Sequence, residues 1–224
     1  MLRDSEVLAE ISGYEETPYS TRLFRDVALL QEKASFRLNQ IDVFAVAAGP
    51  GSFTGLRVGL TAVKAWSEVH AKPIAAISGL EAIAAESLTG EAPGASNAHF
   101  LAPFLDARRG QIFGAIYQRI SGDAAGLVLA SDESILSLDE FLELVKGKSP
   151  QTVELVSPTP DVLPAARLKE ALPGARIIQV SAALAPAIGR LGFERAMRGD
   201  LVDSITLDAN YVRRSDAESA WKDG

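Results

Sequence analysis

Four glycines and a proline lie within residues 47–60, AAGPGSFTGLRVGL, between an apolar run and a segment of helical pattern. A strand, then glycines, then a helix N-terminus directs free backbone N–H groups and the positive end of the helix dipole at one point, where phosphate can bind. The same glycines could instead let two backbones approach closely, or simply end one element and begin the next. The candidate phosphate-binding residues are Gly49, Gly51, Ser52, Thr54 and Gly55.

The spacing of these glycines fits neither of two common nucleotide-binding patterns. The Walker pattern G-x-x-x-x-G-K-[ST] requires lysine after its last glycine, but Gly55 is followed by Leu56. The dinucleotide pattern G-x-G-x-x-G fails because Gly51 and Gly55 are one residue too far apart. Phosphate binding at this bend is therefore one hypothesis beside the two structural roles.

The helix expected after the bend is apolar over most of its surface. Its polar residues form one narrow stripe, namely Arg57, Thr61, Lys64 and Glu68. A helix that packs on one sheet needs an apolar stripe of only roughly 100°. Something besides its own sheet should therefore cover this helix, either another part of the chain or a partner subunit.

Residues for catalysis are scarce. The chain has no cysteine and only two histidines, His70 and His99, so disulfides and thiolate metal sites are excluded and a Ser–His–Asp triad is poorly supplied. The carboxylates show no obvious pairing that would mark a general acid and base. We predict no catalytic residue and no metal site.

The bulk composition is that of a folded protein that is neither basic nor membrane-spanning. Of 224 residues, 47% are hydrophobic and 23% charged, and the net charge is −7. No apolar stretch of about twenty residues occurs, and the first residues do not resemble a signal peptide, so we expect a cytoplasmic protein. Neither half is basic, which predicts weak direct binding to nucleic acid. We interpret the small arginine clusters as solvated surface charge, at Arg108–Arg109, at Arg190, Arg195 and Arg198, and at Arg213–Arg214.

Strands and helices alternate over the first hundred residues, the pattern of a layered α/β domain with right-handed crossovers. Residues 41–48 (IDVFAVAA) form a nearly continuous apolar run, typical of a strand that helices cover on both sides. We expect strands at 8–11, 41–48 and 74–77, and helices at 20–36, from the glycine stretch to about 70, and at 79–87.

A second α/β set follows a loop rich in Gly, Pro and Ala at 89–98, which marks a domain boundary. Gly110 suits a turn that needs positive φ, and Ser137 with Glu140 forms a capping box that opens a helix. We expect strands at 100–105, 111–120, 127–130, 153–156 and 176–180, a short helix between the last two, and a long helix at 182–197 that stops at Gly199. Two α/β lobes result, residues 1–100 and 101–224.

The run GPGSFTGLRVG at 49–59 resembles the signature of the TsaB (YeaZ) family. Further segments agree with that family in order, namely DVFAV at 42–46, ISGLEA at 77–82, LDARRG at 105–110 and YVRR at 211–214. The resemblance covers about residues 7–218 and is weaker between 122 and 175.

The resemblance implies a fold and a role. The family has the duplicated actin/Hsp70-like (ribonuclease H-like) fold, which agrees with two α/β lobes, and its bacterial members are needed to make threonylcarbamoyladenosine in tRNA, beside the anticodon. They act as a non-catalytic partner that stabilises the catalytic subunit TsaD, together with TsaE and with threonylcarbamoyl-AMP supplied by another enzyme. We therefore expect no tightly bound cofactor, ATP or ADP only within the complex, and tRNA contact only through the complex.

By the same resemblance, the metal-binding motif of TsaD has no counterpart here. TsaD carries HLEAH on the helix after its own glycine bend, and the matching residues 79–83 read GLEAI. Gly79 and Ile83 stand where the two histidine ligands would be, and neither can coordinate a metal.

The resemblance also supplies an occupant for the apolar helices. Helices near 20–36 and 55–70 would pack against the equivalent helices of TsaD or of a second copy, and the glycines would permit the tight bend that presents the second helix. The expected interface residues are Leu23, Val27, Leu30, Gly59, Ala62, Val63, Ala65 and Trp66.

One departure from the family concerns its first strand, and two other functions stay open as alternatives. The family usually opens with an apolar strand and an Asp-Thr-Ser turn before the segment that resembles residues 2–11, so we expect either an upstream start or loss of that strand. A glycoprotease-like metallopeptidase would need metal ligands. An independent ATPase or sugar kinase of the same fold would need that opening phosphate loop.

Overall fold

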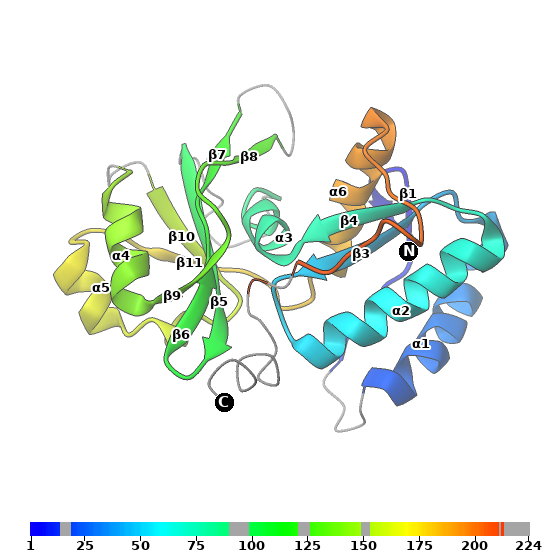
Figure 1. Cartoon of the computed structure of the whole chain (residues 1–224), viewed down its shortest axis with the longest axis horizontal. Coiled ribbons are helices and arrows are strands. Elements are labelled where there is room, and N and C mark those ends of the chain that lie inside the picture. The colour runs from blue at the N-terminus through cyan, green and yellow to red at the C-terminus, as the bar shows by residue number, and fades with distance from the viewer. Residues whose placement is uncertain (14–18, 90–98, 121–125, 149–152, 211, 213–224) are drawn as a thin grey trace, which may run out of the picture. The chain divides into compact units, whose positions relative to one another are not determined.

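A computed structural model describes residues 1–13, 19–89, 99–120, 126–148, 153–210 and 212 (Figure 1). Two compact units emerge: one comprises Met1–Ala82 with Ser181–Ala209, the other Ile83–Val180 with Asn210–Gly224. The loop expected at the domain boundary, 90–98, and the arginines at 213–214 lie outside the described residues.

The first unit is built on two parallel strands, β3 (Phe44–Gly49) and β4 (Ile74–Ser78), which pair from Phe44 opposite Ile74 to Gly49 opposite Ser78. Helix α2 (Phe53–His70) covers one face of this pair. Its Leu60 and Val63 pack with Phe44, Val46, Ile74 and Leu207. Helix α1 (Tyr19–Ala34) contacts α2, and a 3₁₀ turn, η1 (Leu38–Gln40), leads from α1 toward β3 (Figure 1).

The opposite face of the two strands is covered by α6 (Ala185–Arg198), which arrives from far along the chain. A Cβ built on Gly192 would lie 2.5 Å from the Cβ of Ala45 and 3.4 Å from that of Ala75, so this glycine lets α6 sit directly on the sheet. The predicted division placed this helix in a lobe of residues 101–224. Because its buried face packs on β3 and β4, residues 181–209 belong instead with the N-terminal unit.

The N-terminus differs from the expected strand at 8–11. A short hairpin forms earlier, β1 (Leu2–Arg3) with β2 (Glu6–Val7), and the left-handed backbone of Asp4 (φ 53°) makes its turn. The N–H groups of Leu8 and Ala9 then both donate to the carbonyl of Met1, so this segment closes on the hairpin and forms no strand.

The second unit holds a seven-stranded sheet. Five strands lie in the order β11-β10-β5-β6-β9, and β7 pairs with both β5 and β8. The strands are β5 (Phe100–Arg108), β6 (Gln111–Gly114), β7 (Tyr117–Arg119), β8 (Leu127–Leu129), β9 (Ser134–Ser137), β10 (Val153–Ser157) and β11 (Ile177–Gln179). The helical elements are α3 (Gly79–Glu86), which begins in the first unit, α4 (Leu138–Lys146), η3 (Pro160–Val162) and α5 (Ala165–Ala171).

Two details of this sheet differ from the sequence prediction. The strand expected at 111–120 divides into β6 and β7, because the chain turns inward between them and the Ile116 N–H donates to Ser131 Oγ at 2.8 Å. Strand β9, which the sequence analysis missed, pairs with β6 and leads directly into the capping box of α4.

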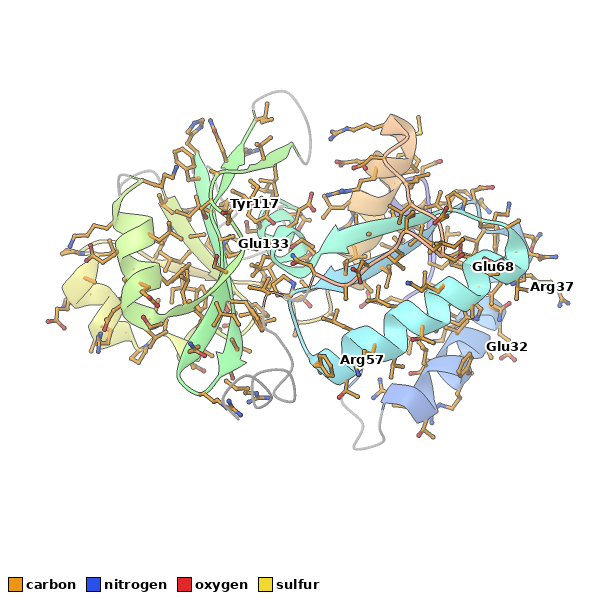
Figure 2. The ribbon with its side chains drawn as sticks, viewed as in Figure 1. Glu32, Arg37, Arg57, Glu68, Tyr117 and Glu133 are labelled. Atoms are coloured by element: carbon orange, nitrogen blue, oxygen red, sulfur yellow. The ribbon has the colours of Figure 1, made fainter. Side chains whose placement is uncertain are left out.

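Glu133 accepts hydrogen bonds from the Tyr117 hydroxyl (2.6 Å) and the Asn210 amide (2.5 Å), and Figure 2 shows Tyr117 and Glu133 together.

Gly79→Ala tests the tightest backbone approach in the first unit. A Cβ at Gly79 would lie 2.8 Å from the Pro50 carbonyl oxygen, so the variant must displace backbone, and we expect the free energy of unfolding to fall by about 1–3 kcal/mol. Gly59→Ala, in the interior of α2, is the control. Its Cβ meets open space, and we expect stability to rise by about 0.5–1 kcal/mol. Chemical denaturation measures both, and equal effects of the two substitutions would contradict the packing argument.

Ser137→Ala tests the capping box of α4. The pKa of the Glu140 carboxyl is lowered, first by the backbone N–H of Ser137 and then by its hydroxyl, each 2.7 Å from Oε2. A lowered folded-state pKa adds stability above the unfolded pKa, and that stability is lost as pH falls through the folded value. The variant keeps the backbone donor, so we expect the Glu140 pKa to rise only part of the way to its ordinary value in an NMR titration. The Ser134 hydroxyl faces the Asp132 carbonyl, so Ser134→Ala should leave this pKa unchanged.

Candidate functional site

The glycine bend is held by close backbone packing. Strand β3 ends at Gly49, whose φ is 114°, and a cis Gly49–Pro50 peptide leads to the N-cap of α2 at Ser52. The Ser52 hydroxyl accepts the Gly55 N–H at 3.4 Å. The first residue of α3, Gly79, lies against the Pro50 carbonyl, where no side chain fits. The bend therefore fixes where α2 and α3 begin.

The candidate phosphate-binding residues lie around this bend. Ser52 and Thr54 are exposed, a Cβ on Gly51 would meet open space, and one on Gly55 would meet only Ser52 at 3.5 Å. Packing therefore requires glycine at 79 and leaves room at 51 and 55. Nucleotide binding through Gly49, Gly51, Ser52, Thr54 and Gly55 stays a prediction.

The predicted interface residues of α2 divide into two groups. Ala62 and Val63 are each only 7% exposed, and Val63 packs in the core beside Phe44, so neither is available to a partner. Ala65 is exposed, and Gly59 borders open space. The sequence analysis placed Ala62 and Ala65 on one surface, but the chain itself covers Ala62.

On α1 the predicted residues Leu23, Val27 and Leu30 form the half-buried face of the helix. Among the side chains of α1 that the structure describes, the large exposed apolar ones are Phe24 (63% exposed) and Leu29 (42%), which the sequence analysis passed over. Each lies next in sequence to a residue of the predicted face, Phe24 after Leu23 and Leu29 before Leu30. An apolar residue beside an already complete apolar stripe could have indicated them.

One aromatic contact joins the two helices. The ring of Phe24 meets Trp66 edge-on, with centroids 6.1 Å apart and planes at 87°, and Trp66 in turn packs on Phe44 at 6.1 Å. Such edge-to-face pairs are favourable, yet most of Phe24 remains in solvent. We call the solvent-facing part of these two helices, which includes Phe24, Leu29, Gly59 and Ala65, the α1–α2 surface.

Charged groups also lie on these two helices. Arg57 lies near the start of α2 with its guanidinium 3.9 Å from the Phe53 ring centroid, and Glu68 lies near the end of α2, where it accepts the Ser204 hydroxyl at 2.6 Å (Figure 2). Glu32 lies near the end of α1 (Figure 2). Next to Ser204, hydrogen bonds from the Thr206 hydroxyl and N–H lower the pKa of Asp203 and order the turn that meets α2. Exposed large apolar side chains such as Phe24 and Leu29 are what a protein interface covers.

Glu81 lies between the two positions that resemble ligand positions of TsaD. Its Oε2 receives Arg195 Nη2 at 2.8 Å, and Arg195 Nη1 also binds Asp200 at 3.0 Å. Ile83 is fully buried. Within the part of the chain that the structure describes, no three His, Cys, Asp or Glu side chains gather as a metal site would require. No helix among those residues is long and apolar enough to span a membrane.

Comparison with known proteins places the chain among tRNA-modification proteins. A family model described as TsaD, tRNA N6-adenosine threonylcarbamoyltransferase, matches residues 17–172. The tRNA threonylcarbamoyladenosine biosynthesis protein TsaB of Bacillus subtilis is 29% identical, covering 99% of this chain and 91% of that protein. The tRNA N6-adenosine threonylcarbamoyltransferase of Ehrlichia chaffeensis is 41% identical over 76 residues, 34% of this chain and 21% of that protein.

Two solved structures share the fold. YeaZ from Pseudomonas aeruginosa superposes with a TM-score of 0.66 at 20% identity, covering 86% of this chain and 84% of that one. An uncharacterized Pseudomonas aeruginosa protein with similarity to peptidase YEAZ gives a TM-score of 0.69 at 21% identity, covering 88% and 85%. These matches confirm the predicted α/β, actin-like fold class.

Proposed function

Because the chain belongs to the TsaD family, tRNA N6-adenosine threonylcarbamoyltransferase, and matches TsaB over nearly its whole length, we propose that it is a non-catalytic scaffold subunit in tRNA threonylcarbamoyladenosine biosynthesis. In this role it binds and stabilises a TsaD-like catalytic subunit. A TsaE-like ATPase joins the assembly, ATP or ADP binds only there, and tRNA is reached through the complex.

The exposed α1–α2 surface is the observation that carries the scaffold role. Phe24 is 63% exposed although its neighbour Trp66 is packed, and the exposed Ala65 has a small side chain beside which another helix can lie closely. Covering such residues releases water and is favourable by roughly 25 cal/mol per Å² of apolar area. The partner we propose is the TsaD-like subunit, and a second copy of this chain is the alternative occupant.

The residue set supports a non-catalytic role in a second way. At the positions that resemble the metal motif, Gly79 and Ile83 have no ligand atoms, and Glu81 is engaged by Arg195. This carboxylate is engaged in a contact within the chain, since its Oε2 accepts from the Arg195 guanidinium at 2.8 Å. In the proposed complex, the TsaD-like partner carries out the reaction.

Ala65→Glu tests the interface. Ala65 is exposed in the chain, so the carboxylate stays in water and the melting temperature should hardly change. In a dry interface the unpaired charge costs several kcal/mol. A penalty of about 3–4 kcal/mol would weaken binding of the TsaD-like subunit by two to three orders of magnitude. Calorimetric titration and thermal unfolding of each variant measure the two effects.

The same change from alanine to glutamate at two other positions serves as a control. Ala62→Glu places the same carboxylate at a position that is 7% exposed, and it should lower the melting temperature. Ala166→Glu, on the exposed side of α5, should change neither stability nor binding. Retained affinity in a well-folded Ala65→Glu variant would refute the α1–α2 surface as the interface.

The isolated chain is expected to be inactive. With no metal ligands or catalytic base identified, it should neither hydrolyse peptides nor transfer a threonylcarbamoyl group to tRNA without the TsaD-like subunit. Its affinity for tRNA should be weaker than about micromolar at physiological salt, because the net charge is −7 and neither half is basic. Product formation by the chain alone, or a sub-micromolar dissociation constant, would contradict the proposal.

A further inference from the structure

The tip of the β5–β6 hairpin has an unusual backbone. Arg108, Arg109 and Gly110 all have positive φ, at 66°, 57° and 72°. Arg108 pairs with Gln111, so Arg109 and Gly110 form a two-residue loop, and the strand register shifts between Asp106 and Arg108. Two-residue loops with positive φ at both residues favour Asn-Gly or Gly-Gly. The sequence analysis foresaw the glycine and interpreted the arginines as solvated surface charge.

Arginine is a poor choice for this backbone. In the left-handed conformation the Cβ of an L-residue crowds the following carbonyl oxygen, so glycine and, less often, asparagine or aspartate occupy it. Packing does not require arginine here, because Arg108 and Arg109 are both exposed. Residues held in such sparsely populated backbone conformations cluster at active sites and ligand-binding positions.

Asp106 orders the arginine side of the tip. Its Oδ1 accepts the Arg108 N–H at 2.7 Å and its Oδ2 pairs with Arg108 Nη1 at 3.3 Å, while the Arg108 side chain remains 85% exposed. A guanidinium has five N–H donors in a rigid fork, and one contact with Asp106 leaves others directed to solvent. A cation that is already oriented loses less conformational entropy when it binds.

We propose that the β5–β6 hairpin tip, residues 106–111, contacts phosphate groups of the tRNA in the assembled complex. The inference rests on the proposed function, which brings this chain to tRNA. The guanidinium fork matches phosphate oxygens, which makes arginine the suited residue for such a contact. Since the chain as a whole is acidic, a local pair of arginines, one of them oriented by Asp106, is how it can hold an RNA backbone.

Arg108→Gly combined with Arg109→Asn gives the loop the residues its backbone favours and removes both charges. The variant should melt at the same temperature as the wild type or higher, and assemble equally with the TsaD-like subunit. The assembled complex should bind unmodified substrate tRNA about tenfold more weakly, and the slope of log affinity against log salt should become less steep by about one to two.

Two control variants isolate the effect of the arginines. Arg108→Lys with Arg109→Lys keeps both charges and should keep the salt slope. Lys146→Gln removes an exposed charge from α4 of the same unit, where it pairs with Glu143, and should leave the slope and the affinity unchanged.

The outcomes separate this inference from the proposed function. If the variant with Arg108→Gly and Arg109→Asn assembles and binds tRNA with an unchanged slope, the inference is wrong and the scaffold role stands. If the variant fails to assemble although it is well folded, the arginines bind a protein surface, which also overturns the RNA assignment. If the wild-type chain does not assemble with the catalytic subunit, the proposed function fails and this inference fails with it.

Discussion

The close approach of Gly79 to the Pro50 carbonyl sets the geometry of the first unit. A Cβ at position 79 would lie 2.8 Å from that oxygen, so the bend after β3 and the start of α3 after β4 can share this space only if one residue has no side chain. Because β3 and β4 are parallel, both of these turns lie at the carboxyl ends of the strands. The bend thereby fixes where α2 starts, and the core residues Leu60 and Val63 fix its rotation.

The rotation of α2 decides which residues face outward. With Val63 in the core and Ala62 covered by the chain, Ala65 remains exposed, and Trp66 meets Phe24 of α1 edge-on. One glycine contact at the bend thus has a consequence far along the helix, because an α-helix transmits a rotation at its start along its length. The proposed scaffold role uses this rigidity, since a surface that is already ordered loses little entropy on binding.

Local signals predicted most elements, and distant contacts account for the errors. Helices α1, α2 and α6 follow their apolar periodicity, and α6 stops at Gly199, where φ is 74°. Strand β9 has four residues and no periodic signal, and pairing with β6 defines it. No local pattern shows that α6 returns to the first unit, because its partners in β3 and β4 lie more than a hundred residues earlier in the chain. Periodicity also groups residues on one face without showing which face is covered, so Ala62 was assigned outward and Phe24 was missed.

The Glu81–Arg195 pair holds the start of α3, the helix that by resemblance corresponds to the metal-binding helix of TsaD. Arg195 ties the first turn of α3 to α6 at 2.8 Å and reaches Asp200 at 3.0 Å, while the Ser78 hydroxyl accepts the N–H groups of Leu80 and Glu81. Removing one partner of such a sheltered pair would leave an uncompensated charge, so the contact favours one position of α3 over others. The turn that by resemblance would hold a metal in a catalytic subunit is here fixed by a salt bridge, a helix cap and a glycine contact. The proposed scaffold role requires ordered surfaces of this kind.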